Sequence, residues 1–182
     1  MPHEIVFEKA KQAERKQLML DQRYLRMAKI WSENSYAVRR QVGCLIVKDK
    51  MIISDGYNGT PSGFENVCEY LQNLDGTIVS CDSLEELNEA KQIGVQKLVT
   101  KPYVLHAEAN AISKLAKSLN NSDGATLYVT DEPCLACSKM IIQSGIVRVV
   151  YWRDYHDHEG TDLLKRAGVQ VDKVEPYFVK NK

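Results

Sequence analysis

Hydrophobic and polar residues follow a helical period at the start of the chain. From residue 4 to about residue 36, apolar side chains recur every three to four positions, which predicts a helix with one buried face. The residues of that predicted face are Tyr24, Met27, Ala28 and Trp31. We also expect this helix to break near Asp21.

The rest of the chain switches between strand and helix patterns. Two short apolar runs, residues 42–47 and 51–57, are separated by Lys48-Asp49-Lys50 and predict a β-hairpin. A later helical face comprises Leu105, Ala109, Ile112 and Ala116. After a loop at 120–124 the predicted elements are a strand at 125–130, a helix at 133–144 ended by Gly145, a strand at 146–152, a helix at 161–167 ended by Gly168, and a strand at 169–174. Strands joined through helices pair in parallel with right-handed crossovers. The sequence therefore predicts an α/β fold with a mixed sheet of about five strands and helices on both faces.

Between the hairpin and the later helix lies a long segment with turn chemistry. It begins in Gly56-Tyr57-Asn58-Gly59-Thr60-Pro61-Ser62-Gly63, where glycine, proline and asparagine favour turns. Ser83-Leu84-Glu85-Glu86 is a capping-box pattern, which predicts a short helix that Gly94 ends. With no internal repeat or linker, we expect one domain spanning 1–182, with an N-terminal helical extension (1–20) and an insert (60–104).

Charge and composition narrow the class of protein. Lysine plus arginine and aspartate plus glutamate balance at 24 each, so no large net field attracts a polyanion, which disfavours nucleic acid as a partner. Five cysteines, two of them in a C-x-x-C, favour a reducing compartment and metal binding over disulfides. The first twenty residues are charged and no run approaches the ~20 apolar residues of a membrane span. We expect a cytoplasmic protein without a membrane partner.

Two short motifs carry the candidate chemistry: His106-Ala107-Glu108 and Pro133-Cys134-Leu135-Ala136-Cys137. Zinc binds imidazole nitrogen and thiolate sulfur, and a catalytic site keeps its fourth position for water. His106, Cys134 and Cys137 supply three ligands, and Glu108 is placed to move protons to and from that water. This combination of motifs, H-x-E followed by P-C-x-x-C, is typical of zinc deaminases that act on nucleobases.

A structural zinc site is the alternative. It would need a fourth protein ligand, for which Cys44, Cys68 and Cys81 are candidates. A structural site has no use for a glutamate two residues after its histidine, and that favours the catalytic interpretation.

With these motifs in place, the chain resembles the deoxycytidylate (dCMP) deaminase family, within the cytidine-deaminase-like three-layer α/β/α fold. The resemblance covers roughly residues 24–155. The segments that carry it are His106-Ala107-Glu108-Ala109-Asn110-Ala111, Leu127-Tyr128-Val129-Thr130, Pro133-Cys134-Leu135-Ala136-Cys137 and Gly56-Tyr57-Asn58-Gly59-Thr60-Pro61. It implies zinc-dependent hydrolysis of dCMP to dUMP and ammonia, a reaction that feeds dTMP synthesis.

The resemblance also implies roles for single residues. Asn58 matches a residue that contacts the sugar, and Arg39 lies where the family contacts the 5′-phosphate, which a guanidinium can grip with two bonds. Tyr128 and Tyr155, and with less support Tyr151, match aromatic neighbours of substrate. Three other interpretations stay open: a turn role for Asn58, a core role for Tyr128, and solvated surface charges at Arg39 and Arg40.

Many family members are hexamers that dCTP activates and dTTP inhibits, which implies a homohexamer with an effector site near the glycine-rich loop. The residues expected to line this site are Gly59, Ser62, Gly63, Glu65, Asn66, Lys114 and Lys117. Either lysine is also explained as a plain surface charge.

Two metal questions remain. Some viral relatives bind a second zinc, but the insert holds only Cys68 and Cys81 and no histidine, so we expect one zinc ion per subunit. His156-Asp157-His158-Glu159 lies in a polar connection and is interpreted as a solvated loop or a loop at the substrate rim.

Two other function classes stay open. A tRNA or single-stranded nucleic-acid deaminase would use the same zinc chemistry, but it needs a basic and aromatic surface for flanking nucleotides. A non-catalytic nucleotide-sensing protein on the same scaffold would have no need of Glu108.

Overall fold

The computed structural model describes residues 2–81, 83–93 and 97–177, and its centre is a five-stranded sheet in the order β2-β1-β6-β7-β8. Its strands are β1 (Gly43–Lys48), β2 (Met51–Tyr57), β6 (Thr126–Asp131), β7 (Arg148–Arg153) and β8 (Gln170–Lys173). β1 pairs antiparallel with β2 and β6, whereas β6, β7 and β8 run parallel. The predicted hairpin, parallel run and mixed sheet are confirmed.

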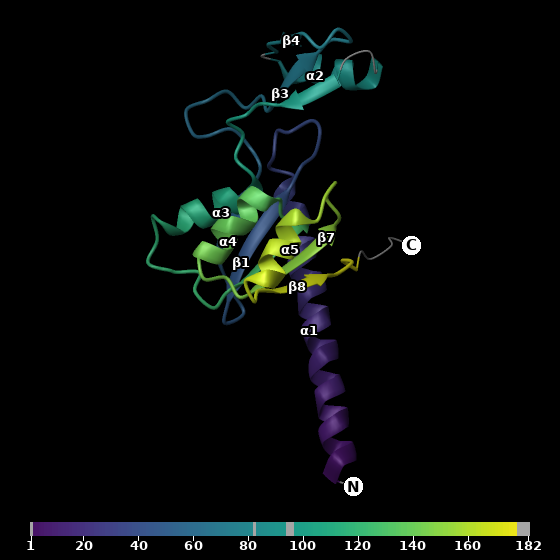
Figure 1. The fold of residues 1–182 in the computed structure, drawn as a ribbon, viewed down its shortest axis with the longest axis vertical. Coiled ribbons are helices and arrows are strands. Elements are labelled where there is room, and N and C mark those ends of the chain that lie inside the picture. Colours follow the sequence, from purple (N-terminus) through teal and green to yellow (C-terminus); the bar gives the residue numbers. More distant parts are fainter. Residues whose placement is uncertain (1, 82, 94–96, 178–182) are drawn as a thin grey trace.

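Helices cover both faces of this sheet (Figure 1). The helices are α1 (Pro2–Ser32) on one face and α3 (Ala107–Leu115), α4 (Leu135–Gln143) and α5 (Glu159–Arg166) on the other. Side chains along β1 alternate between the faces: Leu45 and Val47 pack with α1, while Cys44 and Ile46 pack with α3. The three-layer arrangement is therefore confirmed.

Helix α1 differs from the prediction in two respects. It continues through Asp21 without a break, because that carboxylate is buried in an ion pair with Arg148 of β7. Its buried stripe consists of Asp21, Leu25, Ala28 and Ser32. Met27 and Trp31, predicted to be buried, are 44% and 38% exposed, and the Trp31 ring N–H donates to Asp55 at the surface. The N-terminal half of α1 projects beyond the sheet (Figure 1).

The insert (residues 60–104) forms a second, smaller sheet that the sequence did not predict. Its strands are β3 (Glu69–Gln72), β4 (Ile78–Val79) and β5 (Lys97–Thr100), antiparallel in the order β4-β3-β5. The predicted short helix is present as α2 (Leu84–Ile93), while Gly94, its predicted end, lies outside the described residues. A small core joins them: Val67, Leu71, Cys81, Leu87, Ala90 and Leu98.

Helix α3 sits directly on strand β2, and a glycine makes this contact possible. A Cβ on Gly56 would lie 2.1 Å from the carbonyl oxygen of Ala107, the first residue of α3. The close approach fixes the start of α3 against the sheet. His106 and Glu108, which flank Ala107, are positioned by the same contact.

Candidate metal centre and active site

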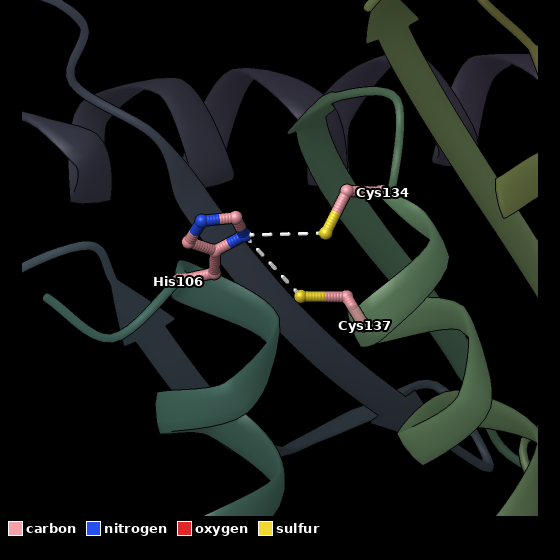
Figure 2. A group of neighbouring side chains, drawn as sticks. All are labelled: His106, Cys134 and Cys137. Atoms are coloured by element: carbon pink, nitrogen blue, oxygen red, sulfur yellow. Dashed lines mark hydrogen bonds between the residues drawn. The ribbon is translucent and has the colours of Figure 1, made fainter. Parts of the chain in front are cut away.

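Three potential metal ligands meet where two helices begin. His106 directly precedes α3, Cys134 directly precedes α4, and Cys137 lies in the first turn of α4. Figure 2 shows the three side chains converging. His106 Nδ1 lies 3.5 Å from Cys134 Sγ and 3.4 Å from Cys137 Sγ, and all three ligand atoms lie within 4.8 Å of one another.

These distances suit a zinc ion. With Zn–N near 2.05 Å and Zn–S near 2.3 Å, the N···S edge of a zinc tetrahedron is about 3.6 Å. No other Cys, His, Asp or Glu among the described residues joins the group. Cys44, Cys68 and Cys81 are buried away from it, so the part of the chain that the structure describes leaves a fourth coordination position open.

The pKa values of the two cysteine thiols shift in opposite directions. Hydrogen bonds from Cys137 and His106 to the sulfur of Cys134 lower the pKa of that thiol to about 3, although partial burial opposes the shift. The hydrogen bond to Cys134 and burial both raise the pKa of Cys137. Cys134 therefore loses its proton readily, whereas Cys137 keeps its own unless a positive charge lies beside both sulfurs, and a divalent metal would supply that charge.

Glu108 lies in the first turn of α3 and is only 4% exposed. Burial raises its pKa to about 7. A carboxyl group with a pKa near neutrality can both accept and release a proton at working pH, which is what a shuttle requires.

A cavity of about 430 Å³ opens beside these groups; we call it the His106 cavity. Its volume falls within the range of small-molecule sites. The residues that line it are Arg39, Arg40, Val42, Asn58, Glu69, Thr100, Val104, His106, Ala107, Glu108, Asp131, Glu132, Cys134, Tyr155 and His156. The structure thus brings three of the four predicted substrate residues, Arg39, Asn58 and Tyr155, to the metal ligands.

The two arginines of this cavity have different partners. The Arg39 guanidinium donates to Thr100 Oγ1 at 3.0 Å and pairs with no carboxylate of the described residues. Arg40 forms an ion pair with Asp131 at 3.0 Å. Asn58 accepts a hydrogen bond from the backbone N–H of Val42 and donates to the carbonyl of Arg40, so it shapes the loop as well as lining the cavity.

Tyr128 is not brought to the site. Its side chain points to the α1 face of the sheet, where it is 2% exposed and its hydroxyl donates to Asp21 at 2.7 Å. The alternation of side chains along β6 explains this position. Tyr151 also misses the His106 cavity, because it is buried in the core between the sheet and α3 to α5.

Several lining residues were missed by sequence reasoning, among them Glu132. Its buried carboxylate accepts hydrogen bonds from Thr161 Oγ1 at 2.7 Å, from His158 Nδ1 at 2.9 Å and from the backbone N–H of Tyr155 at 3.1 Å. Because Glu132 directly precedes Pro133, these bonds hold the loop after β7 against the start of the Pro133 motif. The expected rim position of the His156–His158 segment agrees with His156 lining the cavity.

A second cavity of about 710 Å³ is lined by residues of α3 and of the glycine-rich loop; we call it the Lys114 cavity. Of the residues predicted to line an effector site, Gly59, Ser62, Gly63, Asn66, Lys114 and Lys117 line it. Glu65 is not among the lining residues. Lys114 pairs with Asp55 at 2.5 Å. The backbone of Gly59 pairs with Leu105, the residue before His106, so the loop is joined to the metal centre.

No helix among the described residues has the length and apolar character needed to cross a bilayer.

Comparison with known proteins finds cytidine and deoxycytidylate deaminases. Residues 18–153 match the family model described as the cytidine and deoxycytidylate deaminase zinc-binding region. The chain is 34% identical to the deoxycytidylate deaminase of Enterobacteria phage T4, covering 82% of this chain and 87% of that protein. It is 35% identical to the Schizosaccharomyces pombe deoxycytidylate deaminase, but spans only 44% of its length. A solved structure of the dCMP deaminase from cyanophage S-TIM5, in complex with dCMP and dUMP, matches with a TM-score of 0.65 and 38% identity over 83% of this chain and 93% of that one.

Proposed function

Because the chain belongs to the cytidine and deoxycytidylate deaminase family, we propose that it hydrolyses dCMP to dUMP and ammonia with one zinc ion per subunit. One observation carries the proposal. His106, Cys134 and Cys137 form a zinc site whose fourth position is open within the described residues, and beside it lies a cavity lined by His106, Cys134 and a buried glutamate, Glu108, whose pKa lies near 7. The named relatives, and a similar structure solved with dCMP and dUMP, support this substrate. The dUMP produced would feed dTMP synthesis.

The residues divide the chemistry between them. His106, Cys134 and Cys137 would hold zinc, which activates water for attack on the amino-bearing ring carbon. Glu108 would accept the two protons of this water in turn and deliver the first to the ring nitrogen and the second to the departing amino group, so that dCMP and water become dUMP and ammonia. Its burial excludes bulk water from this transfer.

The rest of the His106 cavity would select the nucleotide. Arg39 is free of carboxylate partners within the described residues, and we assign it to the 5′-phosphate. Asn58 would contact the sugar, and Tyr155 would pack beside the base. Because basic and acidic residues balance, no large net field attracts a polynucleotide, which disfavours a tRNA or single-strand deaminase.

Ammonia release from a panel of substrates tests the function: dCMP, CMP, dCTP, deoxycytidine and single-stranded DNA. We expect strong preference for dCMP. Glu108→Gln should keep a zinc-to-protein ratio near one and lose turnover by about 10²-fold to 10⁴-fold, the usual contribution of a positioned acid–base group. A metal-free protein, or a Glu108→Gln variant with normal turnover, would exclude the mechanism.

Regulation is a second part of the proposal. The Lys114 cavity is large enough for a nucleoside triphosphate, and its lysines offer charge for phosphates. We assign dCTP as activator, dTTP as inhibitor and a homohexamer as the assembly, from the resemblance and this cavity. Hyperbolic kinetics that neither triphosphate changes would remove the regulation, and light-scattering mass would decide the assembly.

A further inference from the structure

We propose that Glu69 and Thr100, both in the insert, are positioning residues that hold Arg39 for the phosphate end of the substrate. The inference rests on the proposed function, because it deepens the role assigned to Arg39. It gives the insert a task in substrate selection.

Glu69 is a buried carboxylate whose partners lie in the arginine loop (residues 37–40). It is 1% exposed. Its two oxygens accept the backbone N–H groups of Val38 and Arg39, each at 3.2 Å. A buried carboxylate is costly unless it is hydrogen-bonded, and bonds to a charged acceptor are roughly twice as strong as neutral ones. Glu69 therefore fixes the backbone from which the Arg39 side chain extends.

Thr100 holds the other end of the same side chain. Its hydroxyl accepts a hydrogen bond from the Arg39 guanidinium at 3.0 Å. Glu69 and Thr100 are cross-strand partners in the β3–β5 ladder, so one residue pair at the end of the insert sheet grips both the backbone and the guanidinium. Both residues line the His106 cavity.

Further contacts fasten this loop to the insert. Val38 packs against the small core of the insert, and its carbonyl accepts a hydrogen bond from Lys91 at 2.5 Å. Arg40 turns the other way and pairs with Asp131 of the central sheet. The arginine loop therefore spans the two sheets, with Arg39 held from the insert side and Arg40 from the central sheet.

This arrangement leaves Arg39 available for a phosphate. A threonine hydroxyl takes one N–H of the guanidinium and leaves other donors for a bidentate contact with an anion. A carboxylate in the same place would neutralise the charge. The insert thus orients the guanidinium without quenching it, and loss of that orientation should weaken phosphate binding while the chemistry at the base continues.

Two substitutions test the proposal by steady-state kinetics on dCMP and deoxycytidine. Glu69→Gln keeps the shape, but its amide nitrogen faces a backbone N–H that it cannot accept. Thr100→Val removes the hydroxyl acceptor. For each we expect KM for dCMP to rise about tenfold, with kcat within about twofold and deoxycytidine kcat/KM unchanged. Glu85→Gln, at an exposed position of α2, makes the same charge change in the insert and should alter none of these.

A double-mutant cycle separates positioning from general structure. If Glu69 acts through Arg39, Glu69→Gln should have almost no effect on dCMP turnover in an Arg39→Ala background. Equal losses for dCMP and deoxycytidine, full additivity with Arg39→Ala, or no change in KM would overturn the inference. Should Glu69→Gln fail to fold, Thr100→Val decides in the same cycle. Wild-type protein that shows no preference for dCMP over deoxycytidine would instead overturn the phosphate role of Arg39 in the proposed function.

Discussion

A substitution at Gly160, the second residue of α5, should disturb the metal centre without replacing any of its ligands. A Cβ at this position would lie 2.0 Å from the carbonyl oxygen of Pro133 and 2.8 Å from the carbonyl carbon of Cys134. Ordinary contact begins at 3.4 Å, so Gly160→Ala must separate the two helix starts by about 1.4 Å. Metal-ligand distances tolerate only about 0.2 Å.

We therefore expect Gly160→Ala to lose zinc and activity together. Overpacking costs about 1–3 kcal/mol, which lowers the melting temperature of a chain this long by about 2–12 °C. Zinc content after extensive dialysis, measured by elemental mass spectrometry, should fall well below one per subunit. Differential scanning calorimetry with and without added zinc should show that zinc raises the melting temperature less than in the wild type.

Gly168→Ala, at the other end of α5, is the matched control. Gly168 has a φ of 82° and a Cβ at that position would meet nothing within 4 Å, so alanine costs about 1–2 kcal/mol through backbone strain alone. It should lose stability and keep its zinc. If Gly160→Ala retains full zinc and wild-type turnover, the close contact between α5 and the ligand helix does not hold the metal centre in place.

Other predictions concern stability and pH. Arg148→Met leaves the Asp21 carboxylate, 3% exposed, without its two guanidinium bonds and should cost about 3–5 kcal/mol in urea unfolding. Burial raises the pKa of Asp21, but bonds from Arg148 and Tyr128 outweigh it and hold that pKa below 3.8. The stabilisation by this ion pair is thus present above pH 3.8 and lost as pH falls through the pKa of Asp21 in the folded protein. The free energy of unfolding should therefore fall more steeply with acid in the wild type than in Arg148→Met, and equal slopes would contradict the argument. The hydrogen bond to Glu132 raises the pKa of His158 above 6.5, so an NMR titration should show that pKa falling in Glu132→Gln.

The central fold was predictable because its signals are local. Each helix between the parallel strands ends at a glycine, and Gly145 and Gly168 adopt φ of 75° and 82°, as an L-residue rarely does. The hairpin turn is equally local, although Asp49 and Lys50 take positive φ without a glycine. Short-range period and end signals were enough to predict the hairpin and the parallel run, whereas the order of the strands within the sheet came from the structure.

The insert and the first helix were less predictable because distant contacts determine them. Strand β4 has only two residues, both exposed, and leaves no periodic signal. In α1 the buried stripe turns toward a charged residue because Asp21 pairs with Arg148, 127 positions away. Periodicity alone had placed Trp31 on that face instead.

The candidate site likewise has a part that was predictable from short motifs and a part that depends on distant contacts. His106 and Glu108 are two positions apart and Cys134 and Cys137 three, so their chemistry is visible in short motifs. The contacts that hold Arg39 are not visible in short motifs, because Thr100 lies 61 positions away and Glu69 lies 30 positions away. A shared zinc motif therefore constrains the reaction far more tightly than the substrate. Differences in substrate among relatives should then arise in the insert and the arginine loop, where substitutions change KM for the nucleotide and leave the metal centre intact.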